Sequence, residues 1–185
     1  ITKQGNIEAG DTVVVIGPGA VGSITYQCAR ALGAGRVIVA GRGSRLEKAK
    51  ALGFETVDVN SRDVMEYVKE ETGGIGPDVV LECAGTAQTI VQAVEMIKKG
   101  GRVVVGGISQ EKGEFPLHRF VLDEIEVVGS RAAPNCLPEV LALTRSGALR
   151  LAELVTHKFP LSEFTTAIKT FRERIDGALK VVVEP

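Results

Sequence analysis

Cysteine and histidine are scarce in this sequence, which limits the kinds of site that it can build. The 185 residues include three cysteines and two histidines, and Cys28, Cys83 and Cys136 lie far apart, without CxxC spacing and without a neighbouring histidine. Disulfide frameworks and zinc sites need more closely grouped ligands. We therefore expect neither a disulfide nor a metal site, and we interpret Cys28 and Cys83 as small buried hydrophobic residues.

Aromatic residues are also few, and neither charge sign is in clear excess. Phe, Tyr and Trp make up 4% of the chain, the formal net charge is -1, and acidic and basic residues are mixed throughout. A chain without a basic stripe or an aromatic platform is not expected to bind nucleic acid or an anionic membrane. No stretch resembles a signal peptide or a membrane span, so we expect a soluble, cytoplasmic protein.

The most informative segment is an apolar strand that runs directly into a glycine-rich loop. Five β-forming residues at 12–16 precede Gly17-Pro18-Gly19-Ala20-Val21-Gly22, and an amphipathic helix is expected from Ala20 onward. In a GxGxxG turn the first glycine permits the tight turn, the second lets a phosphate approach the backbone, and the third lets the helix pack against the strand. Free N–H groups at the helix N-terminus then face the anion. The strand and the helix on either side favour a dinucleotide pyrophosphate site over a simple tight turn.

Short apolar runs alternate with helical segments along most of the chain. This alternation is typical of a parallel sheet with helices on both faces. Gly33 and Gly53 would end the first two helices, and Ser44 is a candidate N-cap of the second. The pattern predicts strands at 12–16, 36–40, 56–58, 78–82, 102–105 and 126–128, and helices at 20–32, 44–52, 62–71 and 87–97. The expected fold class is α/β, with a doubly wound, six-stranded parallel sheet of the Rossmann type that ends near Gly129.

The last part of the chain has a different organisation. It predicts a helix at 137–145, a strand at 154–159, a helix at 162–174 and a strand at 178–183. These elements are too few for an independent domain. We therefore predict a dinucleotide-binding domain at 1–147 and, at 148–185, a strand-helix-strand segment of a second domain whose other elements lie outside this chain.

Several segments together resemble one enzyme family. In chain order they include IEAGDTVVVIGPGAVG, ARALGAGRVIVAG, GPDVVLECAG, IKKGGRVVVGG and VTHKFPLSEFTTAI. With these segments the chain resembles the medium-chain dehydrogenase/reductases over essentially its whole length. The form of the GPGAVG loop is similar to that of the zinc-dependent alcohol, polyol and threonine dehydrogenase branch.

The resemblance implies an activity that also needs a catalytic domain outside this chain. In such enzymes an N-terminal catalytic domain holds zinc through Cys, His and acidic ligands. The zinc polarises an alcohol oxygen, and the alcohol carbon exchanges a hydride with the nicotinamide. The resemblance thus implies that this chain binds NAD(P), ligates no zinc, supplies no catalytic residue and is inactive alone. A primary or secondary alcohol or polyol would bind through the absent domain.

The end of the second predicted strand bears on the choice of cofactor. A carboxylate there normally accepts hydrogen bonds from the adenosine ribose 2′-hydroxyl. This chain instead reads Gly41-Arg42-Gly43-Ser44-Arg45 and has no acid, with Gly41 where the acid of the family would stand. Guanidinium groups can hold a 2′-phosphate with paired hydrogen bonds, so Arg42 and Arg45 favour NADP over NAD. The alternative is a solvated turn with both arginines in water.

Further cofactor contacts are expected at the loops that follow strands four, five and six. Ligands of doubly wound sheets lie beyond the carboxyl ends of the strands. By the family resemblance, the loop after strand five would line the nicotinamide, and Lys180 would lie near the pyrophosphate. Each loop glycine has the alternative of simply ending a strand. The candidates are Cys83, Ala84 and Gly85, then Gly106, Gly107 and Ile108, then Gly129, Ser130 and Arg131, and finally Lys180.

The sequence leaves two other functions open and predicts one assembly. His118 and His157 have no Cys or Glu at a metal-ligand spacing and are interpreted as structural or surface residues. A methyltransferase that uses S-adenosylmethionine is an alternative, although it predicts an acid where Gly41 stands. A non-catalytic nucleotide sensor is another, although it gives no reason for the last segment.

The sixth strand would be a sheet edge, so we expect a homo-oligomer, such as a dimer, that pairs this edge across a two-fold axis.

Overall fold

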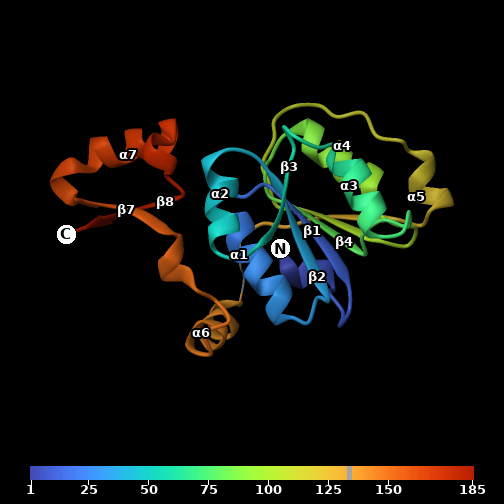
Figure 1. Ribbon diagram of the computed structural model, residues 1–185, viewed down its shortest axis with the longest axis horizontal. Helices are drawn as coiled ribbons and strands as arrows, with labels where there is room; N and C mark the ends of the chain where they lie inside the picture. The colour runs from blue at the N-terminus through green and yellow to red at the C-terminus, as the bar shows by residue number, and fades with distance from the viewer. Residues whose placement is uncertain (133–134) are drawn as a thin grey trace.

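The computed structural model describes residues 1–132 and 135–185 and contains the expected six-stranded parallel sheet (Figure 1). The strand order is β3-β2-β1-β4-β5-β6, and every pair of neighbours is parallel. This order places the point at which the sheet reverses direction between β1 and β4, where doubly wound sheets bind ligands. The strands are β1 (Thr12–Ile16), β2 (Arg36–Gly41), β3 (Glu55–Asp58), β4 (Val79–Glu82), β5 (Arg102–Val105) and β6 (Glu126–Gly129).

Helices cover both faces of the sheet, and the side chains of each strand alternate between the two resulting cores (Figure 1). Val13 and Val15 of β1 pack on the face covered by α1 (Ala20–Ala31) and α2 (Ser44–Ala51). Val14 and Ile16 pack on the face covered by α3 (Val64–Glu71) and α4 (Ala87–Met96). Burial on both faces explains why the central strands read as unbroken apolar runs.

Local interactions move several helix boundaries by one or two residues from those predicted. α3 begins at Val64 because the Asp63 carboxylate accepts hydrogen bonds from the N–H groups of Met65 at 2.7 Å and Glu66 at 3.0 Å. The expectation of Ser44 as an N-cap is wrong, since the N-cap of α2 is Gly43, which has a φ of 69°. The sequence analysis also missed the 3₁₀ helix η1 (Thr2–Gly5) and the five-residue helix α5 (His118–Leu122).

The C-terminal segment forms its own small parallel sheet. It contains α6 (Leu137–Arg145), β7 (Val155–Pro160), α7 (Phe164–Glu173) and β8 (Lys180–Glu184), together with the short 3₁₀ turns η2 (Leu151–Leu154), η3 (Leu161–Glu163) and η4 (Ile175–Gly177). β7 pairs in parallel with β8, so the predicted strand-helix-strand unit is confirmed. In Figure 1 this unit lies beyond α2, on the side away from α4. The division into domains at residue 147 stays a prediction.

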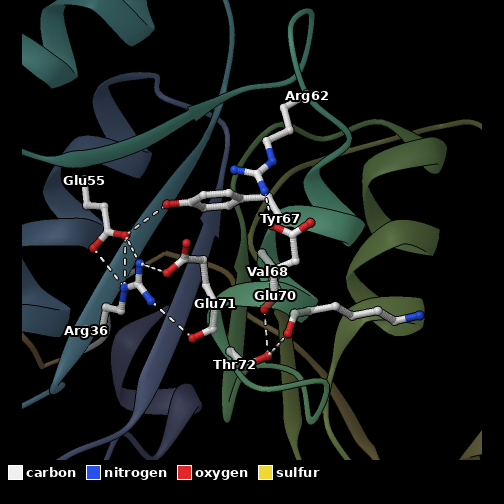
Figure 2. Close-up of polar contacts among 9 residues, drawn as sticks. Arg36, Glu55, Arg62, Tyr67, Val68, Glu70, Glu71 and Thr72 are labelled. Atoms are coloured by element: carbon white, nitrogen blue, oxygen red, sulfur yellow. Dashed lines mark hydrogen bonds and ion pairs between the residues drawn. The ribbon is translucent and has the colours of Figure 1, made fainter.

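A polar network links the amino ends of β2 and β3 to α3 (Figure 2). These amino ends lie at the opposite end of the strands from the glycine-rich loop. The Arg36 guanidinium donates to both Glu55 carboxylate oxygens, with Nε distances of 3.0 and 3.1 Å, and pairs with Glu71 at 2.7 Å. The Tyr67 hydroxyl donates to the same Glu55 carboxylate at 3.2 Å. Glu71 is thus part of an ion-pair network at the end of α3. In the described part of the chain, no helix is long and apolar enough to cross a membrane.

Candidate cofactor site

The glycine-rich loop forms the turn between β1 and α1, and its first and third glycines cannot carry a side chain. Gly17 has a φ of 104°, and a Cβ there would lie 2.9 Å from the Ala84 nitrogen. A Cβ on Gly22 would lie 1.9 Å from the Gly17 carbonyl oxygen. Gly19 is the N-cap of α1 and makes no side-chain cap, so no side chain of the described residues caps the first N–H groups of this helix. Such an end is suited to a phosphate group.

A groove of about 440 Å³ opens beside this loop, at the carboxyl ends of β1, β2 and β4. It combines apolar walls, four polar side chains of α4 and its N-cap, and three arginines. Eight of the residues expected to bind cofactor line it: Gly17, Pro18, Gly19, Gly41, Arg42, Arg45, Cys83 and Ala84. The residues of its lining that the sequence analysis did not single out are Ile16, Ala40, Val59, Val64, Thr86, Gln88, Thr89, Gln92 and Arg174.

Gly41 is held against Pro18 of the glycine-rich loop, which gives a physical reason for the absence of an acid at this strand end. A Cβ on Gly41 would lie 2.2 Å from Pro18 Cδ and 2.5 Å from Cγ. Any larger residue at position 41 would therefore displace the loop that faces the groove. No acidic residue lines the groove among the described residues, so nothing there would repel a phosphate.

Arg42 and Arg45 both line the groove but have different surroundings. Arg42 is exposed, whereas Arg45 is half-buried and its Nε and Nη2 each donate to the Ala178 carbonyl at 3.4 Å. Burial lowers the pKa of Arg45, and the neighbouring positive charge of Arg174 lowers it further. Arg45 is thus more than a charge on a helix surface. It lies between the glycine-rich loop and the C-terminal segment.

The sequence analysis missed Glu82, a carboxyl group that organises the loop after β4. Its side chain is fully buried, and Oε1 accepts hydrogen bonds from Ala84 N at 2.8 Å, Gly85 N at 2.7 Å and the Thr89 hydroxyl at 2.8 Å. Oε2 has no hydrogen-bond partner among the described residues. The available signal was an acid at the end of the otherwise apolar strand VVLE.

Cys83, the residue after Glu82, has a protected thiol. Burial, opposed in part by the Thr25 hydroxyl, raises its pKa to about 12. The thiol is therefore neutral near pH 7, as the interpretation of a small apolar packing residue requires. Cys28 shares this character, because burial also raises the pKa of its thiol.

The loop after β5 lies beside the loop after β4, and the Ser130 N–H after β6 donates to the Val105 carbonyl of β5 at 2.8 Å. The N–H groups of Gly106 and Gly107 donate to the Glu82 carbonyl at 2.9 and 3.1 Å, and a Cβ on Gly107 would lie 2.4 Å from the Gly85 backbone. Ile108 beyond them is 90% exposed. The sheet therefore brings these loops to one edge, but they do not line the groove. Cofactor contacts at Gly85, Gly106, Gly107, Ile108, Gly129, Ser130 and Arg131 stay predictions.

The remaining candidates also lie outside the groove lining. Ala20, Val21 and Gly22 form the first turn of α1, where their N–H groups could serve a phosphate, and Val21 is 57% exposed. Lys180 begins β8, and its exposed side chain is not part of the lining. Contacts from these four residues stay predictions as well.

The described residues do not supply a zinc site. Across residues 1–132 and 135–185, no group of three His, Cys, Asp or Glu side chains could hold a metal ion. His157 contacts the neighbouring Thr156 hydroxyl through Nδ1 at 2.9 Å, and His118 is an exposed residue at the start of α5.

The strand order, the glycine-rich turn and the groove define an α/β protein of the dinucleotide-binding class. A family model described as zinc-binding dehydrogenase matches residues 20–146, and a sorbitol dehydrogenase from Halalkalibacterium halodurans is 36% identical over 97% of this chain. The chain belongs to the zinc-binding dehydrogenase family, which confirms the resemblance seen in the sequence.

Solved structures agree with this assignment. An alcohol dehydrogenase from Thermus sp. ATN1 has a TM-score of 0.90 at 34% identity, covering 98% of this chain and 54% of that one. A zinc-binding dehydrogenase from Sinorhizobium meliloti 1021, solved with NADP bound, has a TM-score of 0.89 at 31% identity, covering 100% and 55%. The chain spans about half the length of its relatives, with 53% of the Halalkalibacterium enzyme covered.

Proposed function

We propose that this chain is the NADP-binding part of a zinc-type alcohol or polyol dehydrogenase. The observation that carries the proposal is a groove lined by an uncapped helix end and three arginines, with no acidic lining residue. An NADP molecule presents a pyrophosphate and a 2′-phosphate, which match these two features. The relatives are named sorbitol, arabinitol and alcohol dehydrogenases, which supports an alcohol or polyol as the substrate class.

The residues of the groove fit the cofactor in shape as well as in charge. The bare backbone at Gly17 and Gly19 and the N–H groups of α1 would hold the pyrophosphate, and Arg42 and Arg45 would hold the 2′-phosphate. The loop at 106–108 would orient the nicotinamide through its backbone groups. When bound, the cofactor would supply the hydride acceptor or donor, while this chain would fix its position.

Zinc and substrate binding are not assigned to this chain. Because the described residues hold no metal-binding group, we place zinc, the alcohol and catalysis in the part of the relatives that this chain does not span. The matched family and the relatives are dehydrogenases, so neither the methyltransferase nor the nucleotide sensor is retained.

The same proposal includes an assembly through the outer edge of the sheet. β6 is an edge strand, and its Val127 side chain is 36% exposed. Pairing β6 with its copy across a two-fold axis would satisfy both the open backbone groups and this apolar side chain. We propose that the protein is a cytoplasmic dimer. Sedimentation of the purified protein would test the dimer, because it measures the mass of the particle in solution.

Cofactor binding is the direct test of the proposal. We expect the purified chain to enhance NADPH fluorescence on titration, to bind NADPH more tightly than NADH, and to show no heat of binding with S-adenosylmethionine. Arg42→Ala should weaken NADPH binding about tenfold and leave NADH nearly unchanged, because a charged hydrogen bond to phosphate is worth about 1.5–3 kcal/mol. Lys50→Ala, on an exposed part of α2 outside the groove, is the matched control. Equal losses for both cofactors in Arg42→Ala would reject the 2′-phosphate role.

A further inference from the structure

Arg174 reaches the nucleotide groove from the C-terminal segment. It follows the last residue of α7 and has a left-handed backbone, with a φ of 56° and a ψ of 35°. It lines the same groove as Arg42 and Arg45, which follow β2 in a distant part of the chain. The folded chain therefore brings three guanidinium groups to one site from two distant parts of the sequence.

The turn that carries Arg174 rests directly on the start of α2. The Ala178 carbonyl, just after this turn, accepts from Arg45 Nε and Nη2 at 3.4 Å. Gly177 lies so close to Ser44 that an added Cβ would be 3.3 Å from the Ser44 Cβ. These two contacts hold the turn against α2. The position of Arg174 beside the groove is therefore set by the packing of this turn against Ser44 and Arg45.

The three arginines carry positive charge that no carboxylate neutralises. In the described part of the chain, none of them forms an ion pair, although five other arginines do. Their groove has no acidic lining residue, and Arg174 is close enough to lower the pKa of Arg45. Like charges that converge without a partner repel one another, so an anion in the groove would stabilise the arrangement.

We propose that Arg174 binds the 2′-phosphate of NADP together with Arg42 and Arg45, so that the C-terminal segment helps to select NADP over NAD. This inference rests on the proposed function. A 2′-phosphate monoester carries close to two negative charges at neutral pH, as phosphoryl groups with a second pKa near 6 do. Arg42 and Arg45 follow β2 and supply two positive charges, and Arg174 adds a third guanidinium from the C-terminal segment. The third guanidinium would also link the cofactor to the segment that leads back toward the catalytic part.

Arg174→Gly is the most informative variant, because glycine adopts the left-handed conformation readily and removes only the side chain. We expect this variant to bind NADPH and adenosine 2′,5′-bisphosphate about tenfold more weakly than the parent chain and NADH within twofold of it. Arg174→Lys should recover part of the NADPH affinity, because it restores the charge without the planar fork. Arg172→Ala, an exposed arginine of the same helix outside the groove, should bind both cofactors like the parent.

The outcomes separate this inference from the proposed function. Equal weakening for NADPH and NADH in Arg174→Gly would assign the residue to the pyrophosphate or to the fold, and would overturn the inference. Unchanged NADPH binding in Arg174→Gly, with weakened binding in Arg42→Ala, would also overturn it while leaving the proposed function in place. A parent chain that binds neither NADPH nor NADH would overturn both.

Discussion

The contact between Gly41 and Pro18 predicts that a single methyl group at the end of β2 disturbs the glycine-rich loop. In Gly41→Ala the new Cβ would lie 2.2 Å from Pro18 Cδ, whereas ordinary contact begins at 3.4 Å, so the ring must move by about 1.2 Å. A proline ring has no alternative rotamer that could avoid the clash. The adjacent Gly17 N–H is hydrogen-bonded to the Ala40 carbonyl at 2.8 Å, so the movement would strain this anchor.

The size of the effect follows from the cost of overpacking. A buried methyl group that forces a backbone shift costs about 1–3 kcal/mol of the free energy of unfolding. Pro18→Ala removes Cγ and Cδ and leaves only the Cβ contact, at 3.4 Å. The double variant should therefore recover most of the loss. We expect a favourable coupling of about 1–2 kcal/mol between the two substitutions, within the range seen for residues in contact.

Urea unfolding of the parent, both single variants and the double variant measures this coupling. Gly129→Ala is a matched control for stability, because a Cβ there meets nothing within 4 Å, and it should change the free energy of unfolding by less than about 0.5 kcal/mol. Additive effects of the two substitutions would refute the clash. So would a Gly41→Ala variant as stable as the parent.

Three further substitutions test the groups that hold the site and the sheet. Glu82→Ala should lower the free energy of unfolding by about 3 kcal/mol, since three partly buried donors lose their acceptor, and Glu82→Gln should recover most of this loss. Urea curves that leave Glu82→Ala as stable as the parent would contradict this. Because the pKa of Cys83 is raised from 9.0 to about 12, the unfolded state loses the thiol proton first as the pH rises. The free energy of unfolding should therefore fall by about 1.4 kcal/mol per pH unit between these two pKa values, and urea titrations of Cys83→Ala should lack this component. Although burial opposes ionisation, Lys98 and the Thr12 N–H lower the pKa of Asp78. The ionised carboxylate therefore stabilises the fold above the unfolded pKa of 3.8, and this stabilisation is lost as the pH falls through the folded pKa. Asp78→Asn should lose less stability than the parent when thermal melts are repeated at acid pH.

Regular elements could be predicted because their signals are local. The apolar run at Thr12–Ile16 and the glycine-rich loop after it require only neighbouring residues, and the structure places β1 at these bounds. Alternation of strands and helices was enough to give the parallel sheet. The five-residue helix α5 escaped because it buries no residue and so leaves no apolar periodicity.

The parts of the site that escaped prediction depend on contacts between distant residues. The missing acid at Gly41 was visible in the sequence, but its contact with Pro18 depends on the way the loop folds over β2. Arg174 follows a helix, whereas the rule for ligands of doubly wound sheets points to the ends of the strands. Its approach to Arg45 depends on the packing of Gly177 against Ser44, for which the sequence has no local signal.

A crystal structure of this chain with NADP bound would locate each phosphate directly. We expect the pyrophosphate at the N-terminus of α1, over Gly17 and Gly19, and the 2′-phosphate within about 3.5 Å of the guanidinium nitrogens of Arg42, Arg45 and Arg174. A 2′-phosphate that points into solvent, or a nucleotide bound away from the groove, would contradict the assignment of this site to NADP.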